Sequence, residues 1–530
     1  MNIKHKLADA IKESIGIQEV QPHIDLVEPK GSQFGDYSTS IAFTLYRGRN
    51  PFEVATELIS QIKLDIAFVD KIENKGGYIN FWLNHSFVQQ CLNNILEEGA
   101  RFGSSNIGGG KKVLVEFVST NPTGPLVIVS GRAASVGDSL VRVLNYTGFL
   151  ADAEYYVDDS GKQIDLLEES IKARYNGLED IPEGGYPGEY IKDIASRMKL
   201  LCRADFREFG IKSIIGQAKV TLERFGVRFN NWVYESDIRK AGGPQKVVAI
   251  LEQKGLVYQK DGAVWLKMVD GEDKVLIKSD GDFTYRVPDI AYHIDKYNRG
   301  YELLIDLFGP DQSHIPELKA GLSICGVPEE VLKIITLQWV TFNRGGQKIG
   351  MSKRKGEFIT LDELLDEVGK EAARFFFLTR KCESHLDFDI ELAKQTSKDN
   401  PVYYVQYVGA RISSILKMAG SSEDRRQRTE DGGQNPKSQI LPQMRDPEKS
   451  GTNSNEVQEF KSSRVQDFKW QKEENPKTQI LNPNEENPNE EKVVSENIPL
   501  TNARLVLIKA VRQVISNGLS LIGIGAPEEM

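Results

Sequence analysis

A strand, a tight turn and a helix follow one another between residues 112 and 146, and this succession constrains the fold more than any other feature. Residues 112–118 (KVLVEFV) are an apolar, β-rich run typical of a buried parallel strand. Residues 121–125 (NPTGP) predict a turn, and residues 131–146 have helical periodicity. Free backbone N–H groups and the helix dipole would make this turn an anion site. Many α/β proteins contain the same crossover without binding a ligand, so the pattern alone leaves both interpretations open.

Composition excludes several classes of protein. The 530 residues are 40% hydrophobic and 27% charged, an ordinary globular composition with enough length for several cores. The net charge is −9, so a nucleic-acid partner would need a local basic surface. The four cysteines lack CxxC spacing, which predicts reduced thiols and no metal site. Because no segment has the apolar length of a membrane span or the apolar core of a signal peptide, we expect no membrane partner and a cytoplasmic location.

The order of segments predicts a multidomain α/β protein. Residues 1–105 resemble a small α+β module, and in residues 106–365 strand-like and helix-like stretches alternate, which predicts a parallel sheet with helices on both faces. Residues 366–420 and 498–530 are helical in pattern. Residues 421–497 are rich in Glu, Asn, Gln, Pro, Lys and Ser and contain the near-duplicates QNPKSQIL and ENPKTQIL. Such a segment cannot bury enough apolar surface to offset its ordering entropy, which predicts a disordered, low-complexity insert.

Several short motifs occur in a fixed order along the chain. They are QFGDYS at 33–38, GYINFWL at 77–83, VEFVSTNPTGPL at 115–126, FTYRVPDIAYH at 283–293, GMSKRKG at 350–356 and NPVYYVQYVGARI at 400–412. Together they resemble the signatures of the arginyl-tRNA synthetases, class I enzymes with a Rossmann-type catalytic domain, an additional N-terminal tRNA-contacting domain and an all-α anticodon-binding domain. The resemblance covers about residues 1–415 and 500–530.

This resemblance implies an arginine–tRNA ligase, which forms arginyl-adenylate and then transfers arginine to tRNA(Arg). It implies L-arginine, ATP as its magnesium complex and tRNA(Arg) as partners, no tightly bound cofactor, and a monomer. A guanidinium presents five N–H donors and keeps its charge, so its pocket needs carboxylate and amide oxygens. The residues that the resemblance assigns to arginine are Glu116, Asn121, Tyr285, Asp289 and Asp311.

The ATP side departs from the family pattern. A His-φ-Gly-His tetrad is expected at residues 127–130, which read VIVS, and Gly350 replaces the first lysine of the mobile KMSKR loop. The candidates that remain are Ser130 and Lys353 for catalysis, and Thr123, Gly124, Pro125, Leu126, Val127, Val129, Gly131, Met351, Ser352 and Lys355 for ATP binding. Loss of one preorganised donor commonly lowers a rate by about 10²–10³-fold. The alternative is a catalytically impaired paralogue that acts as a tRNA- or protein-binding module.

The resemblance also implies two tRNA-contacting regions, one in the N-terminal module and one in the first helices of the anticodon-binding domain. The residues it assigns are Phe34, Tyr78, Asn80, Tyr404, Gln406, Tyr407 and Arg411. Aromatic bases stack on tyrosine and phenylalanine, and arginine binds the backbone phosphates. Tyrosines at helical spacing are more often part of a core, so both roles stay open for the last four.

Overall fold

The computed structural model describes residues 3–15, 24–45, 48–64, 67–268, 272–310, 314–349, 359–430 and 498–530. The chain divides into two compact units, residues 1–411 with 506–530 and residues 412–505. Over the described ranges, no helix combines the length and the apolar character needed to cross a membrane.

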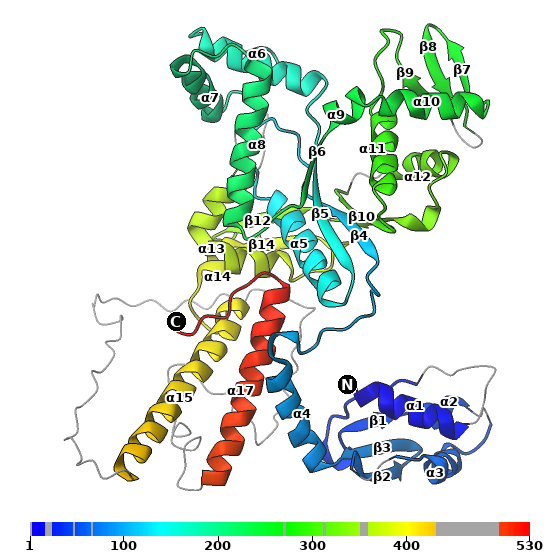
Figure 1. Ribbon diagram of the computed structural model, residues 1–530, viewed down its shortest axis with the longest axis vertical. Coiled ribbons are helices and arrows are strands. Elements are labelled where there is room, and N and C mark those ends of the chain that lie inside the picture. Colours follow the sequence, from blue (N-terminus) through cyan, green and yellow to red (C-terminus); the bar gives the residue numbers. More distant parts are fainter. Residues whose placement is uncertain are drawn as a thin grey trace. The chain divides into compact units, whose positions relative to one another are not determined.

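A three-stranded antiparallel sheet organises the N-terminal module (Figure 1). Strand β3 (Tyr78–Leu83) lies between β1 (Tyr37–Thr39) and β2 (Val69–Lys75), and the helices are α1 (Ile3–Ile15), α2 (Ile41–Leu45), α3 (Pro51–Gln61) and α4 (His85–Glu98). The QFGDYS motif fits this sheet closely, because a Cβ on Gly35 would lie 2.5 Å from the Phe81 carbonyl oxygen. Asp36 then accepts a hydrogen bond from the Leu83 N–H at 2.8 Å, which fixes the motif to the end of β3.

Five parallel strands form the central sheet, in the order β11-β10-β4-β5-β6. Their bounds are β4 (Lys112–Glu116), β5 (Leu150–Val157), β6 (Asn231–Tyr234), β10 (Leu303–Phe308) and β11 (Leu332–Thr336). The strand order reverses between β4 and β10, and open α/β sheets bind their ligands beyond the carboxyl ends of the strands at such a point. This arrangement confirms the predicted Rossmann-type sheet.

Helices and two smaller sheets accompany the central sheet (Figure 1). The helices are α5 (Ser130–Tyr146), α6 (Lys162–Tyr175), α7 (Glu189–Leu200), α8 (Phe206–Arg224), α9 (Glu235–Lys240), α10 (Gly243–Gln253), α11 (Arg286–Asn298), α12 (Ile315–Ile324), α13 (Leu361–Phe377) and α14 (Ile390–Lys394). Strands β7 (Val257–Lys260), β8 (Ala263–Leu266) and β9 (Lys274–Ile277) form an antiparallel sheet. Strand β12 (Val340–Arg344) pairs antiparallel with β13 (Gln347–Lys348) and parallel with β14 (Leu386–Asp389).

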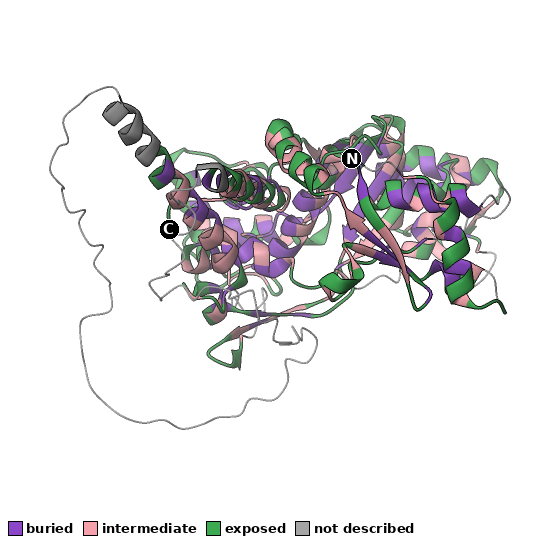
Figure 2. Ribbon diagram, turned by 90° about the horizontal axis from the view of Figure 1, so that it is seen from below, coloured by how far each residue is buried: buried purple, intermediate pink, exposed green. Residues whose placement is uncertain are grey.

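The core is divided by the central sheet itself. Successive side chains of a strand point to opposite faces, and β4 follows this rule. Val113 and Val115 belong to one buried apolar cluster with α5, whereas Leu114 belongs to a second cluster with α10 and α11. Both faces of β4 are therefore covered, and this explains its uninterrupted apolar run. Figure 2 colours each residue by its burial.

Two long helices lie near the C-terminus, α15 (Pro401–Glu430) and α17 (Ile498–Leu521). Helix α15 continues to Glu430 and so includes residues 421–430, the start of the predicted low-complexity insert. Glu, Arg and Gln have good helix propensity, and a boundary drawn from composition alone misses such a polar continuation. The rest of the predicted insert, residues 431–497, lies outside the described residues.

Candidate active site

The chain leaves β4 through a turn with unusual backbone angles. Val118 and Ser119 have φ values of 70° and 37°, a region that residues with a Cβ rarely adopt. The Ser119 hydroxyl accepts a hydrogen bond from the Tyr156 N–H at 3.1 Å, which ties the turn to β5. Backbone strain of this kind clusters at functional sites, where the surrounding structure holds it. Here it turns the chain across the carboxyl edge of the sheet.

Asn121, which we predicted to bind arginine, lies beside the end of β5. Its Nδ2 donates to Asp158 Oδ2 at 3.2 Å and to Gln163 Oε1 at 3.1 Å. Burial, followed by the charge of Glu235, raises the pKa of Asp158 to about 6. Glu235 itself accepts a hydrogen bond from the Tyr156 hydroxyl at 2.9 Å. This edge therefore gathers acidic oxygens that suit a cationic group.

Glu116 ends β4 in a buried ion cluster. The Lys296 ammonium donates to Glu116 Oε2 at 2.5 Å and to Asp306 Oδ1 at 2.8 Å, and its side chain is 0% exposed. Burial raises the pKa of Glu116, while Lys296 opposes this rise. Burial likewise favours protonation of Asp306, but Lys296 and His293 outweigh it and lower the pKa of Asp306 to about 2. The charges are paired, as buried charges in proteins must be.

His293 connects this cluster to Asp289. Its Nε2 lies 2.6 Å from Asp306 Oδ2, and its Nδ1 lies 2.8 Å from the Asp289 carbonyl oxygen and 3.1 Å from Asp289 Oδ1. Burial and Lys296 lower the pKa of His293, but Asp306 and Asp289 outweigh them and raise it to about 10. The ring is therefore charged at neutral pH.

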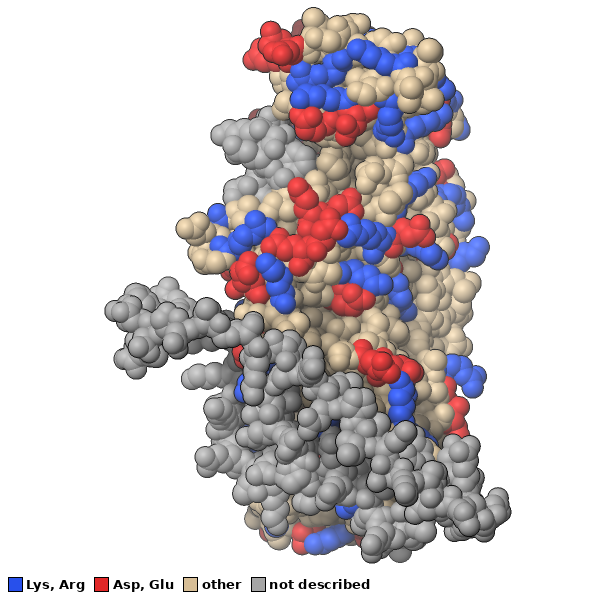
Figure 3. All heavy atoms as spheres, turned by 90° about the vertical axis from the view of Figure 1, so that its left-hand side faces the viewer, with Lys and Arg blue, Asp and Glu red and all other residues tan. Residues whose placement is uncertain are grey.

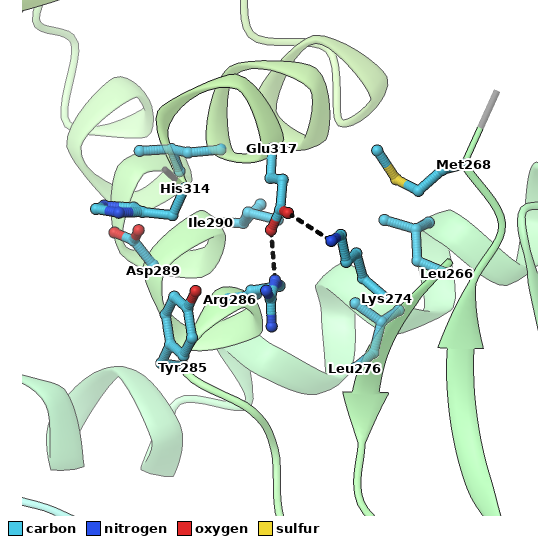
Figure 4. Close-up of a pocket in the computed structure, with 11 residues that line it drawn as sticks. Leu266, Met268, Lys274, Leu276, Tyr285, Arg286, Asp289, Ile290, His314 and Glu317 are labelled. Carbon is cyan, nitrogen blue, oxygen red and sulfur yellow. Dashed lines mark hydrogen bonds and ion pairs between the residues drawn. The ribbon is translucent and has the colours of Figure 1, made fainter. Parts of the chain in front are cut away.

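Tyr285 and Asp289 line one pocket between α11, α12 and the β7–β9 sheet (Figure 4). Tyr285 is 58% exposed, and its ring meets that of His314 nearly at a right angle, with centroids 6.2 Å apart. In Figure 4 the Asp289 carboxylate lies on the same side as these two rings, while Glu317 lies between Arg286 and Lys274. Apolar side chains complete the lining, namely Leu266, Met268, Leu276, Ile290 and Leu318.

Residues 121–131, here called the signature turn, pack against the segment that begins α13. Leu126 accepts a hydrogen bond from the Leu361 N–H at 2.8 Å, and the Ile128 N–H donates to the Ile359 carbonyl at 3.0 Å. Val127, between them, is only 6% exposed. Upstream, the Thr123 carbonyl accepts the Tyr190 hydroxyl at 2.6 Å, and Gly124 and Pro125 continue the turn. The first tetrad position is thus occupied by a buried apolar side chain with no donor.

The start of α5 differs from our prediction. The N–H groups of residues 130–132 donate to the carbonyls three residues earlier, at 2.8, 3.0 and 3.3 Å. The prediction of free N–H groups is therefore wrong for these three, because the first turn closes on its own loop with 3₁₀-type hydrogen bonds. The Ser130 hydroxyl is buried and has no hydrogen-bond partner among the described residues. Val129 is 40% exposed, and Gly131 lies directly against Phe377.

Five predicted site residues lie outside the described residues. They are Asp311, which we assigned to arginine, and Met351, Ser352, Lys353 and Lys355, which we assigned to catalysis and ATP binding.

The predicted tRNA-contacting residues of the N-terminal module divide into two kinds. Phe34 and Tyr78 are 39% and 48% exposed, and the Lys75 ammonium lies 5.1 Å from the Phe34 ring centroid. Asn80, however, is 1% exposed and donates to the backbone carbonyls of Glu73 and Tyr78 within the sheet. Its burial favours a structural role, and the tRNA contact of Asn80 stays a prediction.

The four candidates on α15 are all partly buried. Tyr407 stacks on Tyr403 with ring centroids 6.3 Å apart, and Gln406 donates to the Gly525 carbonyl at 2.9 Å. Tyr404 and Arg411 lie on the same helix. On the face drawn in Figure 3, basic and acidic side chains are interspersed wherever described residues are visible. A nucleic acid on that face would meet both signs of charge.

Sequence reasoning missed the residues that hold the site together, namely His293, Lys296, Asp306, Glu154 and Arg299. Glu154 is 0% exposed, and Arg299 binds both of its oxygens, at 2.6 and 2.8 Å. A signal was present for Asp306, since it is the one charged residue in the apolar run LLIDLF of β10. Asp289, His293 and Lys296 also recur at the spacing of one helix face.

A parallel sheet with a reversal between β4 and β10, acidic side chains at the carboxyl end of β5 and a helical C-terminal region fit a class I aminoacyl-tRNA synthetase. Three family matches agree with this class. Residues 1–83 match the "Arginyl tRNA synthetase N terminal domain", residues 203–384 the "tRNA synthetases class I (R), catalytic domain" and residues 487–530 the "DALR anticodon binding domain". The catalytic-domain match begins beyond the signature turn and α5.

Relatives identify the family. The chain is 39% identical to the arginine–tRNA ligase of Thermotoga maritima, with 100% of this chain and 99% of that protein covered. It is 36% identical to the arginine–tRNA ligase of Bacillus subtilis, with 100% of both covered. The structure of Thermus thermophilus arginyl-tRNA synthetase shares its fold, with a TM-score of 0.67, 21% identity and 100% of both chains covered. The chain belongs to the arginyl-tRNA synthetase family.

Proposed function

We propose that this chain activates L-arginine with ATP, bound as its magnesium complex, and transfers the arginine to tRNA(Arg). The observation that carries this proposal is the Asp289 carboxylate, which lies beside Tyr285 in the pocket between α11, α12 and the β7–β9 sheet. A carboxylate binds a guanidinium through charge-assisted hydrogen bonds, often two at once. We further propose that the protein acts as a monomer in the cytoplasm.

Within this proposal, the polar edge orients the substrate. Asn121 and Asp158, hydrogen-bonded to each other at 3.2 Å, form the end that receives the α-amino group of arginine. The arginine carboxylate then attacks the α-phosphate of ATP, and negative charge grows on the phosphate in the transition state. Ser130 is suited to donate one hydrogen bond there, since its buried hydroxyl has no partner among the described residues.

The remaining roles follow the family resemblance. The turn from Thr123 to Gly131 borders the nucleotide, and Met351, Ser352, Lys353 and Lys355 belong to the loop that receives the pyrophosphate. Residues 1–105 are the N-terminal tRNA-contacting domain, in which the exposed rings of Phe34 and Tyr78 stack on tRNA bases. Residues 106–365 are the catalytic domain, and the helices after it form the anticodon-binding domain.

The test is arginine-dependent exchange of pyrophosphate into ATP, measured with and without tRNA(Arg). We expect exchange in the presence of tRNA and an arginine KM raised by about 10–100-fold in Asp289→Asn, because a charged hydrogen-bond acceptor is lost. Asp237→Asn on the exposed surface of α9 is the matched control and should leave exchange unchanged. Absence of exchange above background in the wild-type chain would rule the proposal out.

The sequence leaves a second candidate, a paralogue that binds tRNA without activating arginine, because Val127 cannot donate a hydrogen bond and Val129 occupies the glycine position. This candidate predicts retention of tRNA(Arg) on a filter together with no exchange. Restoring the tetrad with Val127→His, Val129→Gly and Ser130→His should then raise the exchange rate. If the restored chain stays inactive while it remains folded, the defect lies elsewhere.

A further inference from the structure

Helix α11 presents three charged side chains to the interior on one face. Asp289, His293 and Lys296 are spaced so that they share the side of the helix that packs over β4 and β10. His293 is 1% exposed and Lys296 is 0% exposed, whereas Asp289, at 27%, remains open to the pocket. The three side chains therefore extend from the solvent-accessible pocket, at Asp289, to the buried sheet, at Lys296, and His293 lies between them.

The contacts of the His293 ring require both nitrogens to donate. Nδ1 faces two acceptors of Asp289, the carbonyl oxygen at 2.8 Å and Oδ1 at 3.1 Å. Nε2 faces Asp306 Oδ2 at 2.6 Å. A neutral imidazole carries a proton on only one nitrogen, so it would leave one carboxylate opposite a lone pair. Only the imidazolium satisfies both sides.

The other groups around the ring keep this state in place. Asp306 on β10 also accepts the Lys296 ammonium at 2.8 Å, and Lys296 in turn binds Glu116 on β4 at 2.5 Å. The Tyr292 ring lies 5.5 Å from the imidazole, centroid to centroid. Asp306 is thus held from two directions and cannot follow a movement of His293. The imidazolium is anchored to the sheet, and Asp289 is anchored to the imidazolium.

We propose that His293 is a positioning residue for arginine recognition: its imidazolium ties the Asp289 carboxylate to Asp306 of the sheet and holds it in the orientation that receives the guanidinium. The proposal rests on the proposed function, because it assigns the guanidinium to Asp289. A carboxylate that rotates freely in the free protein would lose rotational entropy each time arginine binds. Binding to an orientation that is already fixed avoids that entropy loss.

Two substitutions separate the two contacts of the ring. The Asn side-chain amide reaches about as far as Nδ1, so His293→Asn retains a donor for Asp289, whereas His293→Gln reaches toward Nε2 and retains a donor for Asp306. We expect both substitutions to weaken arginine binding: His293→Gln by about tenfold or more, because Asp289 loses its donor, and His293→Asn by about threefold, because Asp289 keeps a donor that is no longer anchored to Asp306. His385→Asn, at a half-exposed histidine that contacts Thr341, is the matched control and should bind arginine as the wild type does.

Binding is measured by equilibrium dialysis of radiolabelled arginine, without ATP or tRNA, so that it does not depend on turnover. ATP binding, measured separately, should stay within about twofold in every variant, because none of the residues assigned to ATP belongs to the network. Equal losses in the Asn and Gln variants, or parallel losses of arginine and ATP affinity, would overturn the proposal. A wild-type chain that binds no arginine would overturn it as well. A chain that binds arginine with the expected variant pattern but shows no exchange would refute only the proposed activity.

A spectroscopic readout keeps the proposal testable if the Gln variant does not fold. The chain has only six histidines, so the imidazole ¹⁵N signals of His293 can be assigned by their loss in His293→Asn. At pH 8 both ring nitrogens should be protonated, and both signals should shift when arginine is added. A neutral ring at that pH would refute the bridging role even if arginine affinity changed.

Discussion

The two halves of the candidate site differ in the side chains that lie at their tips, which are charged on the arginine side and apolar at the signature turn. On the arginine side, Glu116, Lys296, Asp306 and His293 form a buried chain of ions that extends from β4 to Asp289. On the signature side, α5 combines close packing with buried polar contacts, because Asp138 pairs with Arg374 and Arg132 donates to the Gln338 and Lys381 carbonyls. A Cβ on Gly137 would lie 2.1 Å from the Phe117 ring. The arginine side therefore keeps its charged residues, whereas apolar residues replace the signature residues at the tip of α5.

This difference teaches which substitutions each half tolerates. Buried ions depend on their partners, because an unpaired charge in the interior costs several kcal/mol, roughly 3–5 when one partner is removed. Packing depends on volume rather than on charge, so the tip of α5 accepts Val127 and Ser130 as long as its base remains closely packed. The loss of the signature histidines consequently leaves the fold intact and affects only what the turn can donate.

The largest effect should follow from breaking the ion chain. Lys296→Met leaves Glu116 and Asp306 buried without their shared cation, and we expect the free energy of unfolding to fall by about 3–5 kcal/mol. Urea denaturation measures this change. Lys240→Met, at a 75% exposed lysine paired with Asp237, should change it by no more than about 0.5 kcal/mol. Similar losses in both variants would show that the buried ions contribute no more than surface ones.

A smaller effect should follow from crowding the base of the signature helix. Gly137→Ala forces a methyl group against the Phe117 ring, and we expect a loss of about 1–3 kcal/mol despite the better helix propensity of alanine. Gly216→Ala is the matched control, because Gly216 lies on the exposed side of α8 with no atom within 4 Å of the new Cβ. That variant should gain about 0.5–1 kcal/mol. A gain in both would mean that α5 is not held by packing.

At the tip of α5, a substitution should lower activity without lowering stability. Ser130→Ala removes a buried hydroxyl without a partner among the described residues, so the urea midpoint should stay unchanged or rise. If Ser130 donates to the reacting phosphate, pyrophosphate exchange should fall by about tenfold or more. Ser139→Ala, which removes an equally buried and unpartnered hydroxyl further along the same helix, should leave exchange unchanged. Equal exchange rates in the two variants would exclude Ser130 from the chemistry.

Much of the fold could be predicted from the sequence because its signals are local. The apolar run at 112–118 and the helical period at 131–146 correspond to β4 and α5 within two residues at each end. The ion chain could not be predicted in this way. Lys296 and Glu116 are distant in sequence and meet only because α11 packs over β4, and nothing in either segment specifies that partner.

The burial of single residues could not be predicted from the sequence either. Alternation in residues 78–83 predicts a strand, but it does not distinguish the exposed Tyr78 from the buried Asn80, two residues further along the same strand. At the start of α5 the sequence indicates the helix dipole, whereas the hydrogen bonds of its first N–H groups depend on the path of the preceding loop. Tertiary contacts decide both cases, so the candidate site could be located from the sequence while its internal bonding could not.

The smallest predicted effect concerns the polar edge beside Asn121 and depends on pH. Burial and Glu235 raise the pKa of Asp158 to about 6, above its value of about 3.8 in the unfolded chain, so the folded protein binds this proton more tightly. The resulting stabilisation is complete below about pH 4 and is lost as the pH rises through 6. Asp158→Asn, which keeps an acceptor for Asn121, should therefore be more stable than the wild type at pH 8, by about 1 kcal/mol after allowance for partial solvent exposure. Urea unfolding at pH 8 and pH 4 measures the difference, which should close at the lower pH. A difference that is the same at both pH values would mean that the carboxylate is not destabilised at this edge, and the contrast between a fully paired ion chain and a partly paired polar edge would then disappear.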